Sequence, residues 1–217
     1  MPPGVESTLS NLDPRRPLVI VDVDEVLGLF VMGFERLLAD HGYELRLQRF
    51  ALLGNIYRCG AETPVDIDTG RALYDEFFKT GVEDMEPAPH AAEQLAALSA
   101  QATIVILTNA PDHCRKPRAR WLTRHGLDYP LMINEGPKGA AVAALAAQTS
   151  GPSAFVDDLL SNLDSAEIAA PHVRRFQLIA DPRLRTMAPA APDRHRRIDD
   201  WPTLGGEITR ALDAAVP

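Results

Sequence analysis

The sequence predicts an α/β protein: a doubly wound, parallel, Rossmann-like sheet with a small inserted helical cap. One reason is the apolar run from Leu18 to Val21, which ends at Asp22 and predicts a strand buried on both faces. A second is that apolar runs alternate with helical periodicity from residue 87 onward, which is typical of parallel β-α-β units. Residues 28–86 interrupt this alternation. We therefore predict a core made of residues 1–27 and 87–217 and a cap made of residues 28–86.

In the predicted cap, apolar residues recur twice at helical spacing. The first group ends at Gly42, a residue type that terminates helices, and its members are Phe30, Phe34, Leu37 and Leu38. The second follows Asp68 and Thr69, which are typical of a helix start, and its members are Leu73, Tyr74, Phe77 and Phe78. Tyr43, Leu45 and Leu47 alternate too briefly to predict a strand. The cap is therefore expected to be helical.

After the cap, strands and helices are expected in turn. The predicted strands are the apolar runs at residues 103–108, 131–134, 153–157 and 176–180. Five helices are predicted. Three have both ends assigned, at residues 89–99 (with proline in the first turn), 112–125 and 204–214. A fourth begins near Lys138, and a fifth follows the strand at 153–157 and ends near Ala170. Residues 181–202 are rich in proline, alanine and arginine and show no periodicity, so a long loop is expected there.

Composition excludes several classes of protein. The 30 acidic residues outnumber the 22 Lys and Arg, and the net charge of −8 argues against binding of nucleic-acid polymers or anionic membranes. Two cysteines, Cys59 and Cys114, form no disulfide framework, and the histidines lack zinc-site spacing. The polar opening, Met1 to Pro17, is predicted to be a loose tail without a signal peptide, and no apolar window predicts a membrane span. We expect a cytoplasmic protein.

Polar residues gather where the predicted strands end. In a parallel sheet these ends share one edge, and ligands bind there. The residues at this edge are Asp22, Asp24, Thr108, Asn109, Lys138, Asp157 and Asp158. An apolar core would not use such residues, because an unpaired buried charge is costly. Mg²⁺ takes carboxylate, water and phosphate oxygens, so this edge is predicted to hold Mg²⁺ and a small phosphorylated metabolite.

These motifs and their order resemble the haloacid dehalogenase (HAD) superfamily. Residues 22–27 resemble its first motif, Asp-x-Asp-x-Thr/Val, and Thr108, Lys138 and the pair Asp157-Asp158 resemble the second, third and fourth. The resemblance extends from about Pro17 to Ala180. Glu25 stands where many relatives have glycine, which leaves the first motif intact but is expected to alter the turn toward the cap.

The resemblance implies a phosphatase that acts through an aspartyl-phosphate. Asp22 would attack phosphorus, and Asp24 would protonate the leaving oxygen and then activate water. Thr108 and Asn109 would bind the phosphoryl group, and Lys138 would neutralise its developing charge. Dehalogenase activity is not expected, because Asp24 supplies the acid and base that a phosphatase needs.

The resemblance also implies the ligands of Mg²⁺. Asp22, Asp158 and the backbone carbonyl of Asp24 would bind the ion directly. Asp157 would either bind it or support a residue that does, and the sequence leaves both open. The basic residues Arg115, Lys116, Arg118 and Arg120 are interpreted as a solvated helix face, with the alternative left open that one of them reaches the substrate.

The substrate stays open. A weaker resemblance to the 5′(3′)-deoxyribonucleotidases makes nucleoside monophosphates one candidate. The features that resemble this family are the compact cap, the segment Thr108-Asn-Ala-Pro with Cys114, Lys116 and Trp121, and the ending Asp199-Asp-Trp201. A phosphomutase would use the same site residues. A phospho-accepting signalling domain also uses strand-end carboxylates with threonine and lysine, but its motif order differs and it has no inserted cap.

Overall fold

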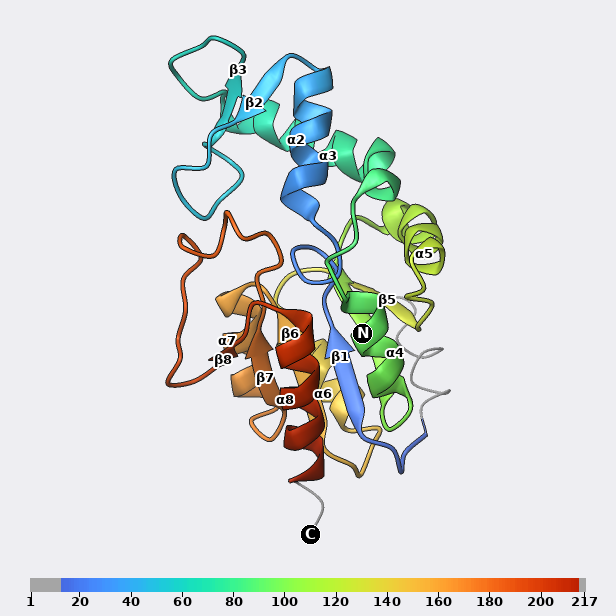
Figure 1. Ribbon diagram of the computed structural model, residues 1–217. Coiled ribbons are helices and arrows are strands. Elements are labelled where there is room, and N and C mark those ends of the chain that lie inside the picture. The colour runs from blue at the N-terminus through green and yellow to red at the C-terminus, as the bar shows by residue number, and fades with distance from the viewer. Residues whose placement is uncertain (1–12, 215–217) are drawn as a thin grey trace.

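A computed structural model describes residues 13–214 (Figure 1). Its centre is a six-stranded sheet, parallel as predicted, with the order β5-β4-β1-β6-β7-β8. The strands are β1 (Leu18–Val21), β4 (Thr103–Asn109), β5 (Leu131–Asn134), β6 (Ser153–Asp157), β7 (Arg174–Gln177) and β8 (Arg196–Arg197).

Helices cover both faces of the sheet because successive strand residues point to opposite sides. Val19 and Val21 pack with α4 (Ala91–Ser99), α5 (Arg115–Arg124) and α8 (Trp201–Asp213). Leu18 and Ile20 pack with α6 (Gly139–Ala146) and α7 (Leu160–Ala169). Every residue of β1 is buried, which explains why that strand is continuously apolar. The predicted doubly wound α/β architecture is confirmed.

The register of the central strands places the site residues next to one another. Val21 lies opposite Ile106 of β4 and Val156 of β6. The following residue, Asp22, donates its backbone N–H to the Val156 carbonyl at 3.0 Å. Asp22 and Asp157 therefore leave adjacent strands at the same level, and Thr108 lies near the end of the strand on the other side of β1.

Residues 28–86, which we call the cap segment, lie above this edge of the sheet (Figure 1). They form α2 (Phe30–Asp40), β2 (Tyr43–Leu45), β3 (Ile56–Arg58), α3 (Ile67–Thr80) and the 3-10 turn η1 (Val82–Asp84). The predicted cap helices are present, but the segment Tyr43–Leu45, for which no strand was predicted, pairs with β3 as an antiparallel ribbon. Each strand has three residues, too few to give a clear alternation in the sequence.

An aromatic cluster holds the cap segment together. Phe30 lies 4.9 Å from Phe77 between ring centroids, and Tyr74 lies 4.9 Å from Phe78. The two linkers to the core run side by side: Leu29 donates its N–H to the Glu86 carbonyl, and Ala88 donates to Leu27. The aromatic cluster is continuous with the core beneath it, because Phe77 and the α5 residue Trp121 belong to one buried apolar group.

Two predictions near the C-terminus need correction. The last long strand is Arg174–Gln177 rather than residues 176–180, because β7 pairs with β6 only as far as Asp157 and Gln177. The buried residues that follow leave the sheet, and Ile179 donates its N–H to the Asp199 side chain instead. The second correction concerns the loop predicted at residues 181–202, which contains the short strand β8 next to β7. Arg185 fixes this segment by donating to the carbonyls of Ile179, Ala180 and Asp199.

The remaining predicted elements agree with the structure to within a few residues, and the 3-10 turn η2 (Asp112–Cys114) precedes α5. Within residues 13–214, no helix is both long and apolar enough to cross a membrane. The predicted N-terminal tail lies mostly outside the described residues.

Candidate active site

Lys138 is the centre of the charged cluster at the edge of the sheet. Its buried ammonium Nζ lies 2.7 Å from Asp22 Oδ1 and 2.7 Å from Asp157 Oδ2. Burial lowers the pKa of Lys138, but the carboxylates of Asp157 and Asp22 outweigh it, so the pKa lies above its ordinary value. Gly139 lets the chain approach α7 here, because a Cβ at this position would lie 2.1 Å from the Ser165 carbonyl oxygen. Lys138 is thus held in place as a cation.

Asp157 is fully engaged by the protein. Its Oδ2 accepts from Lys138, and its Oδ1 accepts from the Leu159 N–H at 2.9 Å and from Asn162 Nδ2 at 3.0 Å. Burial raises the pKa of this carboxyl, and Lys138 lowers it. With both oxygens bound, Asp157 is suited to fixing Lys138 and the turn after β6.

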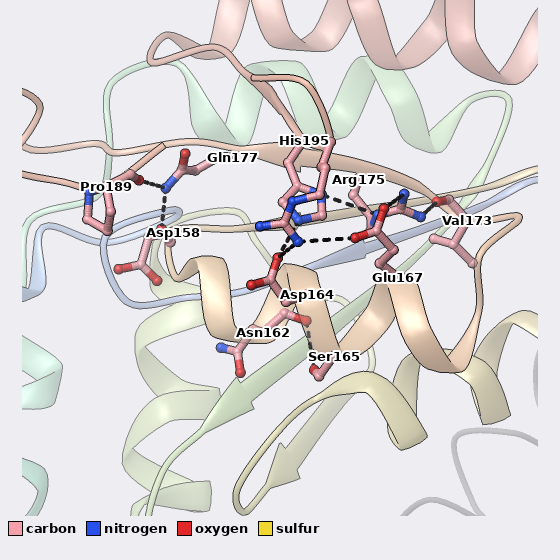
Figure 2. Close-up of polar contacts among 11 residues, drawn as sticks. Asp158, Asn162, Asp164, Ser165, Glu167, Val173, Arg175, Gln177, Pro189 and His195 are labelled. Atoms are coloured by element: carbon pink, nitrogen blue, oxygen red, sulfur yellow. Dashed lines mark hydrogen bonds and ion pairs between the residues drawn. The ribbon is translucent and has the colours of Figure 1, made fainter. Parts of the chain in front are cut away.

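Asp158 differs from its neighbour because no hydrogen-bond donor among residues 13–214 reaches its carboxylate. Its backbone is fixed, since Gln177 donates from Nε2 to the carbonyls of Asp158 and Pro189 at 2.9 Å each (Figure 2). Burial raises the pKa of Asp158 well above its ordinary value, and the charges of Asp157 and Asp22 raise it further. This carboxylate has room for a ligand that the protein itself does not supply.

The donor set fits a divalent cation. Carboxylate oxygens of Asp22, Asp157 and Asp158, all buried, lie within 4.8 Å of one another. Three carboxylates face a single ammonium, Lys138, so the cluster carries excess negative charge. Hard oxygen ligands of this kind suit Mg²⁺, which would balance that charge.

Asp24 pairs with a residue that the sequence interpretation placed in solvent. Arg118 Nη2 lies 2.8 Å and 3.0 Å from the two Asp24 carboxylate oxygens, and the Arg118 side chain is fully buried. The interpretation of Arg118 as part of a solvated helix face was therefore wrong. A signal existed: Cys114, Arg118, Trp121 and Leu122 follow helical spacing, and all four are buried.

Burial and this pair have opposite effects on the protonation of Asp24. Burial raises the pKa of the Asp24 carboxyl, the Arg118 guanidinium lowers it, and the nearby Asp22 charge raises it, which gives a value of about 6. A carboxyl with such a pKa holds and releases a proton near neutral pH, as a general acid and base must.

Thr108 and Asn109 end β4 beside these carboxylates. The Thr108 hydroxyl is buried and finds no hydrogen-bond partner among the described residues. Asn109 is instead held in place, because its Oδ1 accepts from Asn134 Nδ2 at 2.8 Å and its Nδ2 donates to the Gly136 carbonyl at 3.0 Å. An unpaired buried hydroxyl is unusual and marks a position where an external acceptor would be stabilised.

Glu25 adopts the left-handed backbone conformation, with φ of 58°, which explains why glycine suits this position. Its buried carboxylate offsets the strain by accepting from the Val31 N–H at 2.8 Å and the Asp181 N–H at 3.1 Å. Burial raises the pKa of Glu25 to about 7. Glu25 thus ties the start of α2 to the segment that follows β7.

A cavity of about 240 Å³ connects the charged cluster to the cap segment. The charged residues at its base are Asp22, Asp24, Glu25, Lys138 and Asp158, and Asn109 also lines it. Apolar and aromatic residues of the cap segment form the opposite wall, among them Phe30, Leu47, Phe50, Leu52 and Tyr74. Among the predicted site residues, Thr108 and Asp157 lie behind this lining, where they are buried.

A second group with potential metal ligands does not form a site. Asp164, Glu167 and His195 lie close together, but His195 accepts from Arg175 Nε and donates to Asp164 Oδ1 at 2.7 Å (Figure 2). Arg194 lies 2.6 Å from the same Asp164 oxygen. These charges already satisfy one another, and the network fastens the segment before β8 to α7.

No family model matches the chain, and no curated protein matches it. Solved structures do resemble it. The putative HAD-hydrolase YfnB from Bacillus subtilis, bound to magnesium, has 14% identity and a TM-score of 0.58 over 89% of this chain and 99% of that one. A predicted phosphoglycolate phosphatase from Haemophilus somnus has 19% identity and a TM-score of 0.58 over 92% and 100%.

A putative β-phosphoglucomutase from Thermotoga maritima is a further example, with 14% identity and a TM-score of 0.55 over 90% of this chain and 100% of that one. At such low identity the likeness concerns the fold. The chain has the fold of the HAD-superfamily hydrolases, with an α/β core and an inserted segment, as the motifs indicated.

Proposed function

We propose that this protein is a Mg²⁺-dependent phosphatase that hydrolyses a small phosphate monoester through an aspartyl-phosphate. The observation that carries the proposal is the buried group of Asp22, Lys138 and Asp158 at the base of a cavity, with Asp24 beside it. Solved structures with this fold include phosphatases and a phosphomutase by name, which supports chemistry on phosphate esters.

In the proposed first step, an Asp22 carboxylate oxygen attacks phosphorus, and the bond from phosphorus to the leaving oxygen breaks. Asp24 gives its proton to that oxygen, so a neutral alcohol leaves. Asp22 Oδ1 is already oriented by the Val23 N–H at 2.7 Å and by Lys138. In the second step, water attacks the phosphorus, Asp24 takes its proton, and the bond to Asp22 breaks to release phosphate.

The proposed roles of the remaining residues follow from their contacts. Lys138 offsets negative charge beside Asp22, and the unpaired Thr108 hydroxyl donates to a phosphoryl oxygen. Asp22, Asp158 and the backbone carbonyl of Asp24 would hold Mg²⁺, and Asp157 would act by holding Lys138 in place. The bound ion would supply positive charge that allows the phosphate dianion to enter an acidic site.

The proposal extends to the compartment in which the protein works and to its substrate. Cys59 and Cys114 are free thiols, which supports a reducing compartment such as the cytoplasm. The small cavity, of about 240 Å³, supports a small metabolite rather than a polymer as substrate, and nucleoside monophosphates are one candidate.

The decisive experiment measures hydrolysis of p-nitrophenyl phosphate, followed by a panel of phosphate esters, with and without Mg²⁺. We expect turnover that requires the metal and falls by about 10³-fold or more in Asp22→Asn, as for other nucleophile replacements. The matched control, Asp68→Asn, removes a carboxylate whose side chain is 94% exposed and should retain activity. Metal-independent turnover, or an active Asp22→Asn variant, would reject the mechanism. Release of free phosphate distinguishes a phosphatase from a phosphomutase, which would return an isomeric ester.

A further inference from the structure

The wall of the cavity opposite the carboxylates is apolar. Besides the charged base and two asparagines, Asn109 and Asn162, the described lining residues are aliphatic or aromatic. The cap segment supplies most of them, and Leu159 and Leu184 complete the wall from the core. The only polar atom that the cap segment's side chains bring to the lining is the hydroxyl of Tyr74. A substrate held by its phosphate at Asp22 would therefore place the rest of the molecule against apolar surface.

Arg118 is paired with the lining residue Asp24, and the other arginines near the cavity are engaged elsewhere. Arg46 pairs with Glu44 and lies over the Tyr57 ring at 4.2 Å, and Arg49 donates to the Leu53 carbonyl. Arg183, next to the lining residue Leu184, is bound by Asp181 and by Glu35 of α2 at 2.8 Å. Among the described residues that line the cavity, Lys138 is the only cation, and it is already shared by two carboxylates.

A second anionic group on a substrate would be unfavourable in this cavity. It would lose water without gaining a cationic partner, and it would lie near Asp24, Glu25 and Asp158. An uncharged apolar group would instead gain by burying its surface against Phe50 and Leu52. The volume of about 240 Å³ limits that group to a small one.

We propose that the substrate is a phosphate monoester whose leaving group is small, uncharged and largely apolar, such as an aryl or branched alkyl group. This inference rests on the proposed phosphatase function and concerns what the cap segment selects. Bisphosphates and phosphorylated carboxylic acids fall outside the class, and nucleoside monophosphates become the less favoured candidate because a nucleoside is larger and polar.

The test compares two esters that differ by one charge. Phenyl phosphate and 4-carboxyphenyl phosphate share a ring and a phosphoryl group, and the second carries an extra carboxylate. We expect kcat/KM of the wild-type protein with Mg²⁺ to be at least about tenfold higher for phenyl phosphate, because the carboxylate finds no partner. Equal values, or a preference for the carboxylated ester, would overturn the inference.

A cap variant gives a second measurement. Leu47→Arg adds a cation to the apolar wall and should shrink the ratio of the two kcat/KM values toward one. The matched control, Gln48→Arg, adds the same charge at the neighbouring exposed residue, which is not part of the lining, and should keep the wild-type ratio. A ratio that is unchanged in Leu47→Arg, or shifted as much in Gln48→Arg, would contradict selection by this wall.

Failure of the inference and failure of the proposed function can be told apart. If neither ester nor any other phosphate monoester is hydrolysed, the phosphatase proposal fails. Binding of phenylphosphonate and 4-carboxyphenylphosphonate, measured by calorimetry with Mg²⁺, then decides the inference by itself. At least about tenfold tighter binding of phenylphosphonate supports an apolar pocket, and equal or weaker binding rejects it.

Discussion

The two walls of the cavity are built on opposite principles. The core wall consists of buried carboxylates, each fixed through its side chain or backbone, around one buried ammonium. The cap wall consists of aliphatic and aromatic side chains from an ordinary apolar cluster. Under the proposed function, the core wall would carry out the reaction and the cap wall would select the molecule that undergoes it.

The walls also differ in how burial affects the free energy of the folded protein. Burial raises the pKa of both Asp24 and Asp158, which means that their ionised forms are disfavoured in the folded protein. The cap wall gains free energy from burial in the usual way. The core wall therefore depends on compensating charges, so the largest effects are expected there.

Removal of the central cation should give the largest effect. Lys138→Met leaves the carboxylates of Asp22 and Asp157 buried without their shared partner, so we expect a loss of about 3–5 kcal/mol in the free energy of unfolding. Urea denaturation measures it. As a control, Lys79→Met removes a half-exposed lysine of α3 and should change stability by less than about 0.5 kcal/mol. A loss below about 1 kcal/mol for Lys138→Met would show that the cluster is not under electrostatic strain.

Addition of Mg²⁺ should act in the opposite direction. An ion that binds only the folded protein stabilises it by about 2.7 kcal/mol at one hundred times its dissociation constant, which thermal unfolding with increasing MgCl₂ would reveal. Asp158→Asn should abolish this gain. It should also stabilise the metal-free protein, because it removes a buried charge that the neighbouring carboxylates repel.

The control for this prediction comes from the other acidic group. Asp164→Asn should retain the full Mg²⁺ effect, because Asp164 is already satisfied by Arg194 and His195. If Mg²⁺ stabilises Asp158→Asn as much as the wild type, the ion binds somewhere else.

Arg118 joins the two regions, since it contacts Asp24 on one side and lies 3.8 Å from the Met85 sulfur at the end of the cap segment on the other. We expect Arg118→Met to reduce kcat by about 10- to 100-fold. The guanidinium lowers the pKa of Asp24, so its removal should shift the limb of the pH profile that depends on Asp24 to higher pH. Arg118→Lys should restore part of the activity.

Arg120→Met is the matched control, because Arg120 is exposed, pairs with Glu83 and lies on the same helix. It should leave kcat and the pH profile unchanged. A fall in kcat for Arg118→Met without any shift of the pH profile would mean that Arg118 only supports the fold.

The core wall could be predicted because a parallel sheet delivers strand-end residues to one place. Asp22, Thr108 and Asp157 follow from strand position alone, and Lys138 follows from the start of the next helix. Arg118 was missed because three neighbouring cations made the helix look solvated, and only its position between Cys114 and Trp121 indicated burial. Glu25 could be identified as unusual, but its two backbone partners, Val31 and Asp181, depend on the tertiary fold.

The cap wall could not be predicted in the same detail. The helices followed from periodic apolar residues, but β2 and β3 are three residues long and are paired through a loop with little pattern. Leu47, Phe50 and Leu52 lie in that loop, and their common orientation toward the cavity comes from tertiary contacts. A charged motif can be recognised from residue types and their spacing, whereas the shape of an apolar wall depends on the folded structure.

The smallest predicted effect tests whether the two regions unfold together. Asp66 caps α3 in the cap segment by accepting from the Thr69 N–H, and Asp200 caps α8 in the core by accepting from Thr203, each at 2.8 Å. Asp200→Ala should lower Tm by about 2–4 °C, and Asp66→Ala by a similar or smaller amount. These N–H groups lower the pKa of both carboxyls. The contribution is therefore present above their ordinary pKa and is lost as the pH falls through the lowered one.

Both tryptophans, Trp121 and Trp201, lie in the core, so their fluorescence reports core unfolding, whereas far-UV circular dichroism reports all helices. Because the aromatic cluster of the cap segment is continuous with the core, we expect Asp66→Ala to shift both signals by the same amount. The control Glu62→Ala, at an exposed loop residue, should shift neither. A separate, earlier transition seen only by circular dichroism would show that the cap segment unfolds on its own, and the apolar wall of the cavity would then be less stable than the charged wall.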